Sequence, residues 1–138
     1  MTLERFEVAL VSGDRALVDF LADVFELEER PASEHGVGTL YRLQAPGGDI
    51  KVMVPTERPA DAAGQGMLAV QGLRYLTMVV TDLDAVIERC VARGGSVVLD
   101  AFELEPGSRL AIIKDPNGNT MEVTETRATS RASPEVAR

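Results

Sequence analysis

A single carboxylate, Glu122, follows a turn near the C-terminal end of the sequence and is the residue best placed for chemistry. The turn at residues 115–119 reads Asp-Pro-Asn-Gly-Asn, in which the proline fixes φ and the Asn-Gly-Asn segment tolerates positive φ. Apolar residues before this turn and alternating residues after it predict a β-hairpin. Because strand side chains alternate, Met121 and Val123 facing a core would place Glu122 on the opposite face. A carboxylate held there could bind a divalent cation or transfer a proton.

The composition limits the classes of partner. The chain has 138 residues, of which 45% are hydrophobic and 26% charged, as in an ordinary globular domain. A formal net charge of −8 argues against nucleic acid and anionic membranes, because both select clustered Lys and Arg. We therefore expect a small-molecule ligand, neutral or cationic, and no nucleic-acid or membrane partner.

Nothing in the sequence predicts export or membrane insertion. The longest apolar runs, such as residues 76–80, are far too short to span a bilayer, and the N-terminus lacks the hydrophobic stretch of a signal peptide. The single cysteine, Cys90, excludes an intrachain disulfide. We therefore expect a cytoplasmic protein.

The first half of the chain predicts one helix and four strands. Apolar residues recur at steps of three and four over residues 16–25, which predicts a helix with one buried stripe, and Asp14 precedes it as a cap. The flanking segments have the alternation and the Gly and Pro boundaries of strands and turns. The predicted strands are residues 6–11, 27–31, 39–44 and 50–54, with a loop at residues 33–38.

A polar, Gly- and Ala-rich stretch separates this half from a second half with the same order of elements. The second half predicts a strand at residues 73–80, a helix that starts after Asp82 and stops at Gly94-Gly95, a strand at residues 97–102, and the hairpin that carries Glu122. The stripe of the second helix comprises Leu83, Val86, Ile87, Cys90 and Val91. We therefore divide the chain into a first module (residues 1–54), a linker (55–72), a second module (73–125) and a mobile tail (126–138).

Superposing the two halves pairs the positions at which they could carry chemistry. The helix caps lie 68 residues apart, and the glycines of the two hairpin turns, Gly48 and Gly118, lie 70 residues apart. These offsets pair one position in the first strand and one position in the last strand of each module. The pairs are Glu7 with Tyr75, and Val52 with Glu122.

Three segments of the second half resemble one known superfamily. They are the strand and cap from Tyr75 to Leu83, the helix end Arg93-Gly94-Gly95, and the turn and strand from Asp115 to Glu122. Over about residues 5–125 the chain resembles the glyoxalase/bleomycin-resistance/extradiol-dioxygenase superfamily, also called vicinal oxygen chelate proteins. The resemblance implies an α+β fold of two βαβββ modules, whose sheets form paired half-barrels around a cleft. It also implies a homodimer.

The resemblance assigns roles to the paired positions. In metal-using members the ligands are His, Gln or Glu from the first and last strands of each module, so the resemblance implies Glu7 and Glu122 as metal ligands, with Glu122 also catalytic. Tyr75, Val52 and Arg109 are expected to contact a ligand. No histidine stands at any of these positions. The expected cofactor is therefore none, or a weakly bound divalent metal such as Mg, Mn, Zn, Ni or Fe.

Three other reactive residue types have simpler interpretations. His35, the only histidine, is expected in a solvent-exposed loop. Cys90 lies on the buried stripe of the second helix and is expected to pack as a small hydrophobe. Arg74, like Arg109, could steer an anionic ligand or face solvent.

Three functions remain open from the sequence. The missing histidines and Val52 favour a small-molecule-binding protein of the glyoxalase/bleomycin-resistance kind, with a degraded metal site. Glu122 favours the alternative, a divalent-metal-dependent lyase, isomerase or dioxygenase that uses Glu122 and Glu7. The third is a structural dimer without a ligand. The identity of the ligand is not encoded in any motif of the chain.

Overall fold

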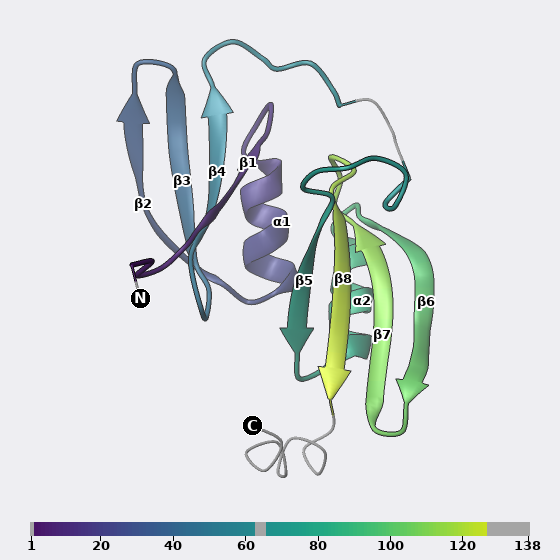
Figure 1. The fold of residues 1–138 in the computed structure, drawn as a ribbon. Coiled ribbons are helices and arrows are strands. Elements are labelled where there is room, and N and C mark those ends of the chain that lie inside the picture. Colours follow the sequence, from purple (N-terminus) through teal and green to yellow (C-terminus); the bar gives the residue numbers. More distant parts are fainter. Residues whose placement is uncertain (1, 63–65, 127–138) are drawn as a thin grey trace. The chain divides into compact units, whose positions relative to one another are not determined.

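The computed structural model describes residues 2–62 and 66–126. The chain forms two compact units, Met1–Ala62 and Ala63–Arg138, and the boundary between them falls within the predicted linker. Each unit has the element order β-α-β-β-β (Figure 1). Residues 127–138, most of the segment predicted to be a mobile tail, lie outside the described residues.

The first unit is a four-stranded sheet with one helix. Strands β1 and β4 pair in parallel, while β3 pairs antiparallel with both β4 and β2, which gives the strand order β1-β4-β3-β2. The elements are β1 (Val8–Val11), α1 (Ala16–Val24), β2 (Glu28–His35), β3 (Gly38–Gln44) and β4 (Ile50–Pro55).

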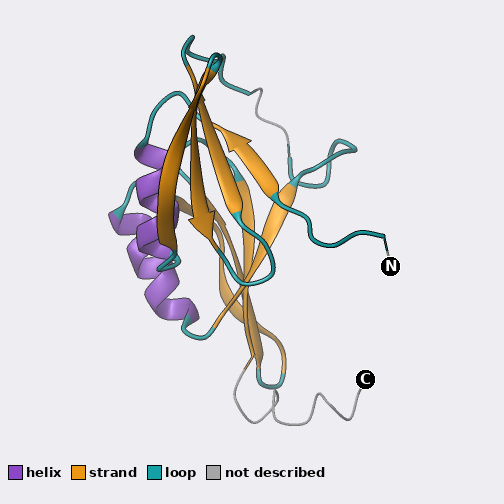
Figure 2. Ribbon diagram, turned by 90° about the vertical axis from the view of Figure 1, so that its left-hand side faces the viewer, coloured by secondary structure: helices purple, strands orange, loops and turns teal. Residues whose placement is uncertain are grey.

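The second unit repeats this topology with the strand order β5-β8-β7-β6. Its elements are β5 (Tyr75–Val80), α2 (Leu83–Ala92), β6 (Ser96–Glu105), β7 (Ser108–Lys114) and β8 (Thr120–Thr126). In each unit the helix covers one face of the unit's own sheet (Figure 2). The predicted α+β fold of two βαβββ modules is confirmed. None of the helices in the described residues is long and apolar enough to cross a membrane.

Helix α1 forms where the apolar spacing predicted it. Asp14 Oδ1 accepts a hydrogen bond from the Ala16 amide at 2.9 Å, which satisfies one of the free amides of the first turn. The buried stripe supplies the core of the first unit, and each fully buried Leu or Phe contributes about 1.5–3 kcal/mol. It comprises Leu17, Val18, Phe20, Leu21 and Val24, each at most 1% exposed.

Helix α2 is bounded by the residues that the sequence indicated. Asp82 Oδ1 accepts from the Ala85 amide at 3.1 Å, and the Gly95 amide donates to the Cys90 carbonyl at 2.8 Å. Gly94 has φ of 90°, so the helix ends in a Schellman motif that only glycine adopts without strain.

The predicted stripe of α2 is partly wrong. Leu83, Val86 and Cys90 are buried, whereas Val91 is 56% exposed. Successive residues of a helix differ by about 100° in direction, so a short helix that rests on a sheet through Cys90 turns the next residue toward solvent.

The segment predicted as a short strand and a loop is one continuous strand. Strand β2 runs through residues 28–35, with a register shift between Arg30 and Ser33 around Pro31. All eight of its residues are exposed, so no alternation of polar and apolar residues marks it in the sequence. An edge strand pairs on one side only and therefore tolerates a proline and a bulge.

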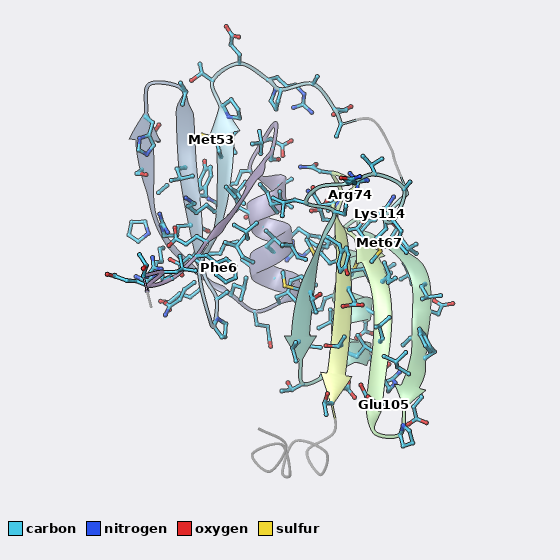
Figure 3. All side chains as sticks on the ribbon, viewed as in Figure 1. Phe6, Met53, Met67, Arg74, Glu105 and Lys114 are labelled. Carbon is cyan, nitrogen blue, oxygen red and sulfur yellow. The ribbon has the colours of Figure 1, made fainter. Side chains whose placement is uncertain are left out.

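Strand β6 also extends further than predicted, to Glu105 at the β6–β7 hairpin (Figure 3). Its pairing with β7 has several register shifts. Irregular pairing of this kind obscures the two-residue period in the sequence.

The turn before β8 is held by a buried carboxylate. Asp115 is 3% exposed, and its Oδ1 accepts from the amides of Asn117 and Asn119, both at 2.9 Å. Oδ2 accepts from Asn119 Nδ2 at 2.8 Å. Burial raises the pKa of Asp115, an effect that these hydrogen bonds oppose. The buried carboxylate thus stabilises the turn between β7 and β8 by accepting hydrogen bonds from the turn residues.

Replacing Asp115 with alanine is expected to lower the free energy of unfolding by about 1–3 kcal/mol, because it removes the acceptor of two amides in a buried turn. Asp115→Asn keeps an oxygen at the Oδ1 position and should lose less. Urea denaturation followed by circular dichroism measures both variants. Asp61→Ala, which removes an exposed aspartate, is the control. Equal stability of Asp115→Ala and the control would contradict the role of this turn.

Candidate functional site

The open face of the second sheet carries Glu122. In the strand register, Thr77 of β5 lies beside Glu122 on one side and Ile112 of β7 on the other. The Thr77 hydroxyl donates to Glu122 Oε1 at 2.9 Å. Met121 and Val123 are fully buried, so Glu122 faces away from the core as predicted.

Tyr75 shares this face with Glu122. It lies two residues before Thr77 on β5, so its side chain points to the same side of the sheet, where 44% of it is exposed. The structure thus brings two of the predicted site residues to one surface. Thr77 was missed by the sequence analysis, although its position two residues after Tyr75 would have indicated it.

Apolar side chains continue the same face across β7 and β6. Leu99 pairs with Ile112, and Phe102 pairs with Leu110. Both β6 residues are more than 40% exposed, although they are large and apolar. The irregular register of β6 concealed these residues in the sequence. The face therefore combines a carboxylate and a hydroxyl with aromatic and aliphatic side chains.

Arg109 lies on the other side of the second sheet. It shares the helix-facing side with Ala111, and its Nη2 atom donates to Asp84 Oδ1 of α2 at 2.9 Å. Glu125, opposite Arg109 in β8, accepts from the Leu83 amide at 2.6 Å. The hydrogen bond to Asp84 raises the pKa of Arg109. The structure gives Arg109 a place between sheet and helix, apart from Glu122 and Tyr75.

The predicted equivalence of Val52 and Glu122 is wrong. Val52 is fully buried in the core of the first unit, beneath α1, whereas Glu122 faces the open side of its sheet. A side chain with no exposed surface is not available to line a ligand site. Val52 is therefore a core residue.

A difference in hairpin length explains the error. Leu43 pairs with Ile50 in the first unit and Ile113 pairs with Met121 in the second, and all four side chains are buried. The connection between the paired residues is one residue longer in the second unit. The residue equivalent to Glu122 is therefore Lys51, on the open face of the first sheet.

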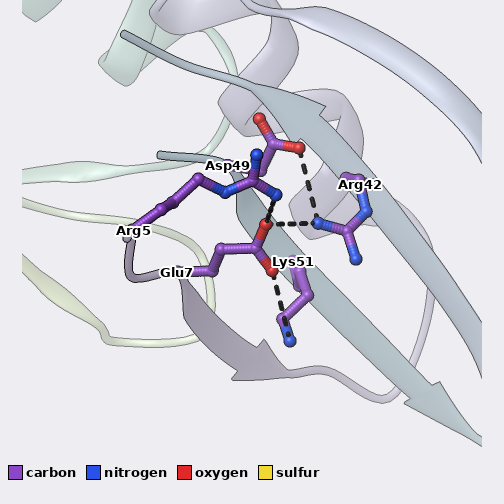
Figure 4. A network of polar contacts seen from close by, with 5 residues as sticks. All are labelled: Arg5, Glu7, Arg42, Asp49 and Lys51. Carbon is purple, nitrogen blue, oxygen red and sulfur yellow. Dashed lines mark hydrogen bonds and ion pairs between the residues drawn. The ribbon is translucent and has the colours of Figure 1, made fainter. Parts of the chain in front are cut away.

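Glu7 lies just before β1 and is surrounded by cations (Figure 4). Glu7 Oε2 accepts from Arg42 Nη1 at 2.8 Å and from the guanidinium of Arg5. Lys51 Nζ lies 3.6 Å from Glu7 Oε1. Asp49 lies 3.4 Å from Arg42 Nη1 and shares that guanidinium. The carboxylate of Glu7 is thus engaged from three sides.

These contacts change the ionisation of Glu7. Hydrogen bonds from Arg42 and then Arg5 lower the pKa of Glu7 to about 2. The same hydrogen bond raises the pKa of Arg42. Glu7 is therefore a permanently charged partner of guanidinium groups at neutral pH.

The predicted ligand positions do not fit a divalent metal ion. Lys51 stands where the other module has Glu122, and guanidinium groups already neutralise Glu7. Divalent ions need several oxygen or nitrogen donors, and adjacent cations repel them. Within residues 2–62 and 66–126, no three His, Cys, Asp or Glu side chains gather as a metal site. Neither module therefore supplies a donor set around its predicted ligand.

Comparison with known proteins agrees with this fold. A family model described as the glyoxalase/bleomycin resistance protein/dioxygenase superfamily matches residues 7–123. The chain belongs to this superfamily. No match was found among curated proteins.

Several solved structures share the fold at low sequence identity. A glyoxalase family protein from Bacillus cereus is 17% identical with a TM-score of 0.80, covering 93% of this chain and 97% of its own. TioX from Micromonospora sp. ML1 is 24% identical with a TM-score of 0.63, and the match covers 90% of this chain and 99% of TioX. FosX from Listeria monocytogenes, a fosfomycin resistance protein complexed with Mn(II) and sulfate, is 17% identical with a TM-score of 0.66, covering 96% and 99%.

The remaining reactive residues have structural surroundings. His35 lies in β2 rather than in a loop, and its Nε2 atom is 2.9 Å from Ser33 Oγ. Cys90 is fully buried as predicted, and burial raises the pKa of its thiol to about 11, so it is not a nucleophile at neutral pH. Arg74 Nη2 donates to the Gly66 carbonyl at 3.2 Å.

Acidification is expected to remove the stabilisation that Glu7 provides. Its pKa falls from 4.5 to about 2 on folding, so the effect is complete above pH 4.5 and is lost as the pH falls toward 2. When the pH is lowered from 4.5 to 2, the free energy of unfolding should therefore fall less in Glu7→Gln than in the wild type.

Urea denaturation at a series of pH values measures the difference. Glu57→Gln, which neutralises an exposed glutamate outside the cluster, is the control and should behave as the wild type. An acid-induced loss of stability that is the same in Glu7→Gln and the wild type would refute the assignment.

Proposed function

We propose that this superfamily member is a small-molecule-binding protein of the glyoxalase/bleomycin-resistance kind, whose ancestral metal positions no longer form a metal site. The observation that carries the proposal is the charge reversal at equivalent positions. Lys51 replaces the carboxylate that the second module has at Glu122, and Glu7 is bound by Arg5 and Arg42. With these two positions unable to donate to a metal ion, the protein would keep the ligand-binding surface of the superfamily and lose the metal-dependent reaction.

The open face of the second sheet supports binding of a ligand with both apolar and polar groups. Phe102 and Leu99 offer apolar contact area, and Tyr75 offers a ring with a hydroxyl. Glu122 and Thr77 supply a hydrogen-bonding pair among them. A small number of polar groups on a largely apolar surface is the usual composition of a small-molecule site.

One observation favours the alternative, a metal-dependent lyase, isomerase or dioxygenase that uses Glu122 and Glu7. The Glu122 carboxylate is accessible, and Thr77 is its one side-chain hydrogen-bond partner within the described part of the chain. An available carboxylate of this kind is suited to proton transfer. The surroundings of Glu7 speak against its part in such a site.

Metal analysis and ligand binding, measured on the same protein, separate the two functions. We expect protein purified without chelator to contain no stoichiometric metal, and calorimetric titration with Mg, Mn, Zn, Ni or Fe(II) to show no site at micromolar affinity. A thermal-shift screen of small molecules, including fosfomycin and bleomycin, is expected to find ligands in the presence of EDTA. Their stabilising effect should fall in Glu122→Gln.

Glu57→Gln is the matched control, because it makes the same chemical change at an exposed position outside both sheets' open faces. Stoichiometric metal that disappears in Glu122→Gln would overturn the proposal. So would turnover of glutathione hemithioacetals, catechols or acyl-CoA epimers that requires one of these ions.

We further propose that the protein is a cytoplasmic homodimer, as the superfamily resemblance implies. Several large apolar side chains are strongly exposed on the single chain, including Phe6, Leu73 and Val79, each at 70% or more. In a dimer, the second chain would cover part of this apolar surface. Light scattering after size exclusion is expected to give twice the chain mass at micromolar concentration. A monomer under these conditions would contradict the dimer.

A further inference from the structure

The open face of the first sheet carries a row of cations that the second sheet lacks. Arg30 of β2 pairs with Arg42 of β3, and Arg42 pairs with Lys51 of β4, so the three side chains point to the same side of the sheet. Like charges directly opposite each other destabilise a sheet unless counter-charges or a ligand neutralise them. The row therefore requires anions.

The corresponding row of the second unit is chemically different. The same register places Leu99, Ile112 and Glu122 at the equivalent positions of β6, β7 and β8. Two cations are thus replaced by apolar side chains, and the third by a carboxylate. Because the modules share one topology, the basic row belongs to the first unit specifically and is not a consequence of the fold.

The carboxylates nearby neutralise only part of this charge. Glu7 and Asp49 lie among four cationic side chains, and both carboxylates contact Arg42. Arg5 and Lys51 contact only Glu7 among the side chains that the structure describes. Arg30 has no hydrogen-bonding or ion-pair partner for its guanidinium within these residues. A local positive surplus thus remains in a chain whose formal net charge is −8.

The unpartnered guanidinium borders an open pocket of about 560 Å³. This volume lies within the range of small-molecule sites. Arg5, Arg30 and Arg42 supply its cations, and Glu7 and Asp49 supply two carboxylates, so the lining keeps one positive charge in excess. Gln44 adds an amide, and the turn residues Gly47 and Gly48 leave one wall without side chains. Glu28 pairs with Gln44 in the register but does not line the pocket.

We propose that this pocket binds the anionic group, a carboxylate or a phosphate, of a small molecule, with Arg30 as its main contact and Arg42 and Arg5 beside it. Guanidinium groups bind both oxyanions through paired hydrogen bonds, which makes them the residues suited to either ligand. Glu7 competes with the ligand for Arg5 and Arg42. The inference rests on the proposed small-molecule-binding function and adds to it a site in the first unit for an anionic group.

Calorimetric titration of the full chain with inorganic phosphate and with citrate tests the proposal, on protein freed of metal by a chelating resin and at constant ionic strength. Saturable binding of either probe is expected, and the tighter one identifies the preferred oxyanion. Arg30→Gln should weaken binding about tenfold, the effect of losing one charge-assisted contact. Arg58→Gln is the matched control, because it also removes one guanidinium from the first unit. The Arg58 guanidinium lies beside Gly13, which follows β1, and Arg58 does not line the pocket.

A second variant tests whether Glu7 competes with the anion, and here binding is expected to become tighter. Glu7→Gln releases two guanidinium groups and should tighten binding severalfold, whereas a merely structural role of the cluster predicts no gain. Absence of saturable binding, equal affinity of Arg30→Gln and Arg58→Gln, or weaker binding by folded Glu7→Gln would overturn the proposal.

The outcome is independent of the metal question, because the protein is freed of metal before the titration. Metal found in the preceding experiment would overturn the metal-free function and leave the anion affinity as measured. Conversely, absence of anion binding would leave ligand binding at the face around Glu122 intact and overturn only the anion site.

Discussion

The alternation of side chains along a strand decides the chemistry of both sheets. A shift of one residue moves a side chain from the core to the open face, so the length of a hairpin determines which residue is presented. The β7–β8 connection is one residue longer than the β3–β4 connection, measured between equivalent buried pairs. This single residue makes Lys51, and not Val52, the counterpart of Glu122.

Two copies of one module therefore present different surfaces. The second sheet exposes Glu122 with Thr77 among apolar side chains, whereas the first exposes a row of cations with Glu7 and Asp49 among them. Both arrangements use the face opposite the helix, since the other face is filled by core residues. A shared topology thus supplies the positions, and individual residues supply the charge.

Most of the fold could be predicted because its signals are local. The periodic stripe of α1, the cap at Asp82 and the glycines that end α2 each depend on a few neighbouring residues. Strand β2 could not be predicted in full, since an exposed edge strand is held by backbone hydrogen bonds that leave no pattern in its side chains. Val91 was misplaced because the contact of α2 with the sheet selects a narrower stripe than the sequence contains.

The sequence by itself determined the superfamily, the two modules and the orientation of Glu122, because turn residues and the strand period encode them directly. Only the tertiary structure decided what surrounds each carboxylate. Arg42 lies 35 residues from Glu7 along the chain and contacts it only because β4 pairs with both β1, which follows Glu7, and β3, which carries Arg42. Arg109 likewise contacts Asp84 only because α2 packs on β7. Such partners are set by register across strands and helices, and a single sequence carries no local signal of register.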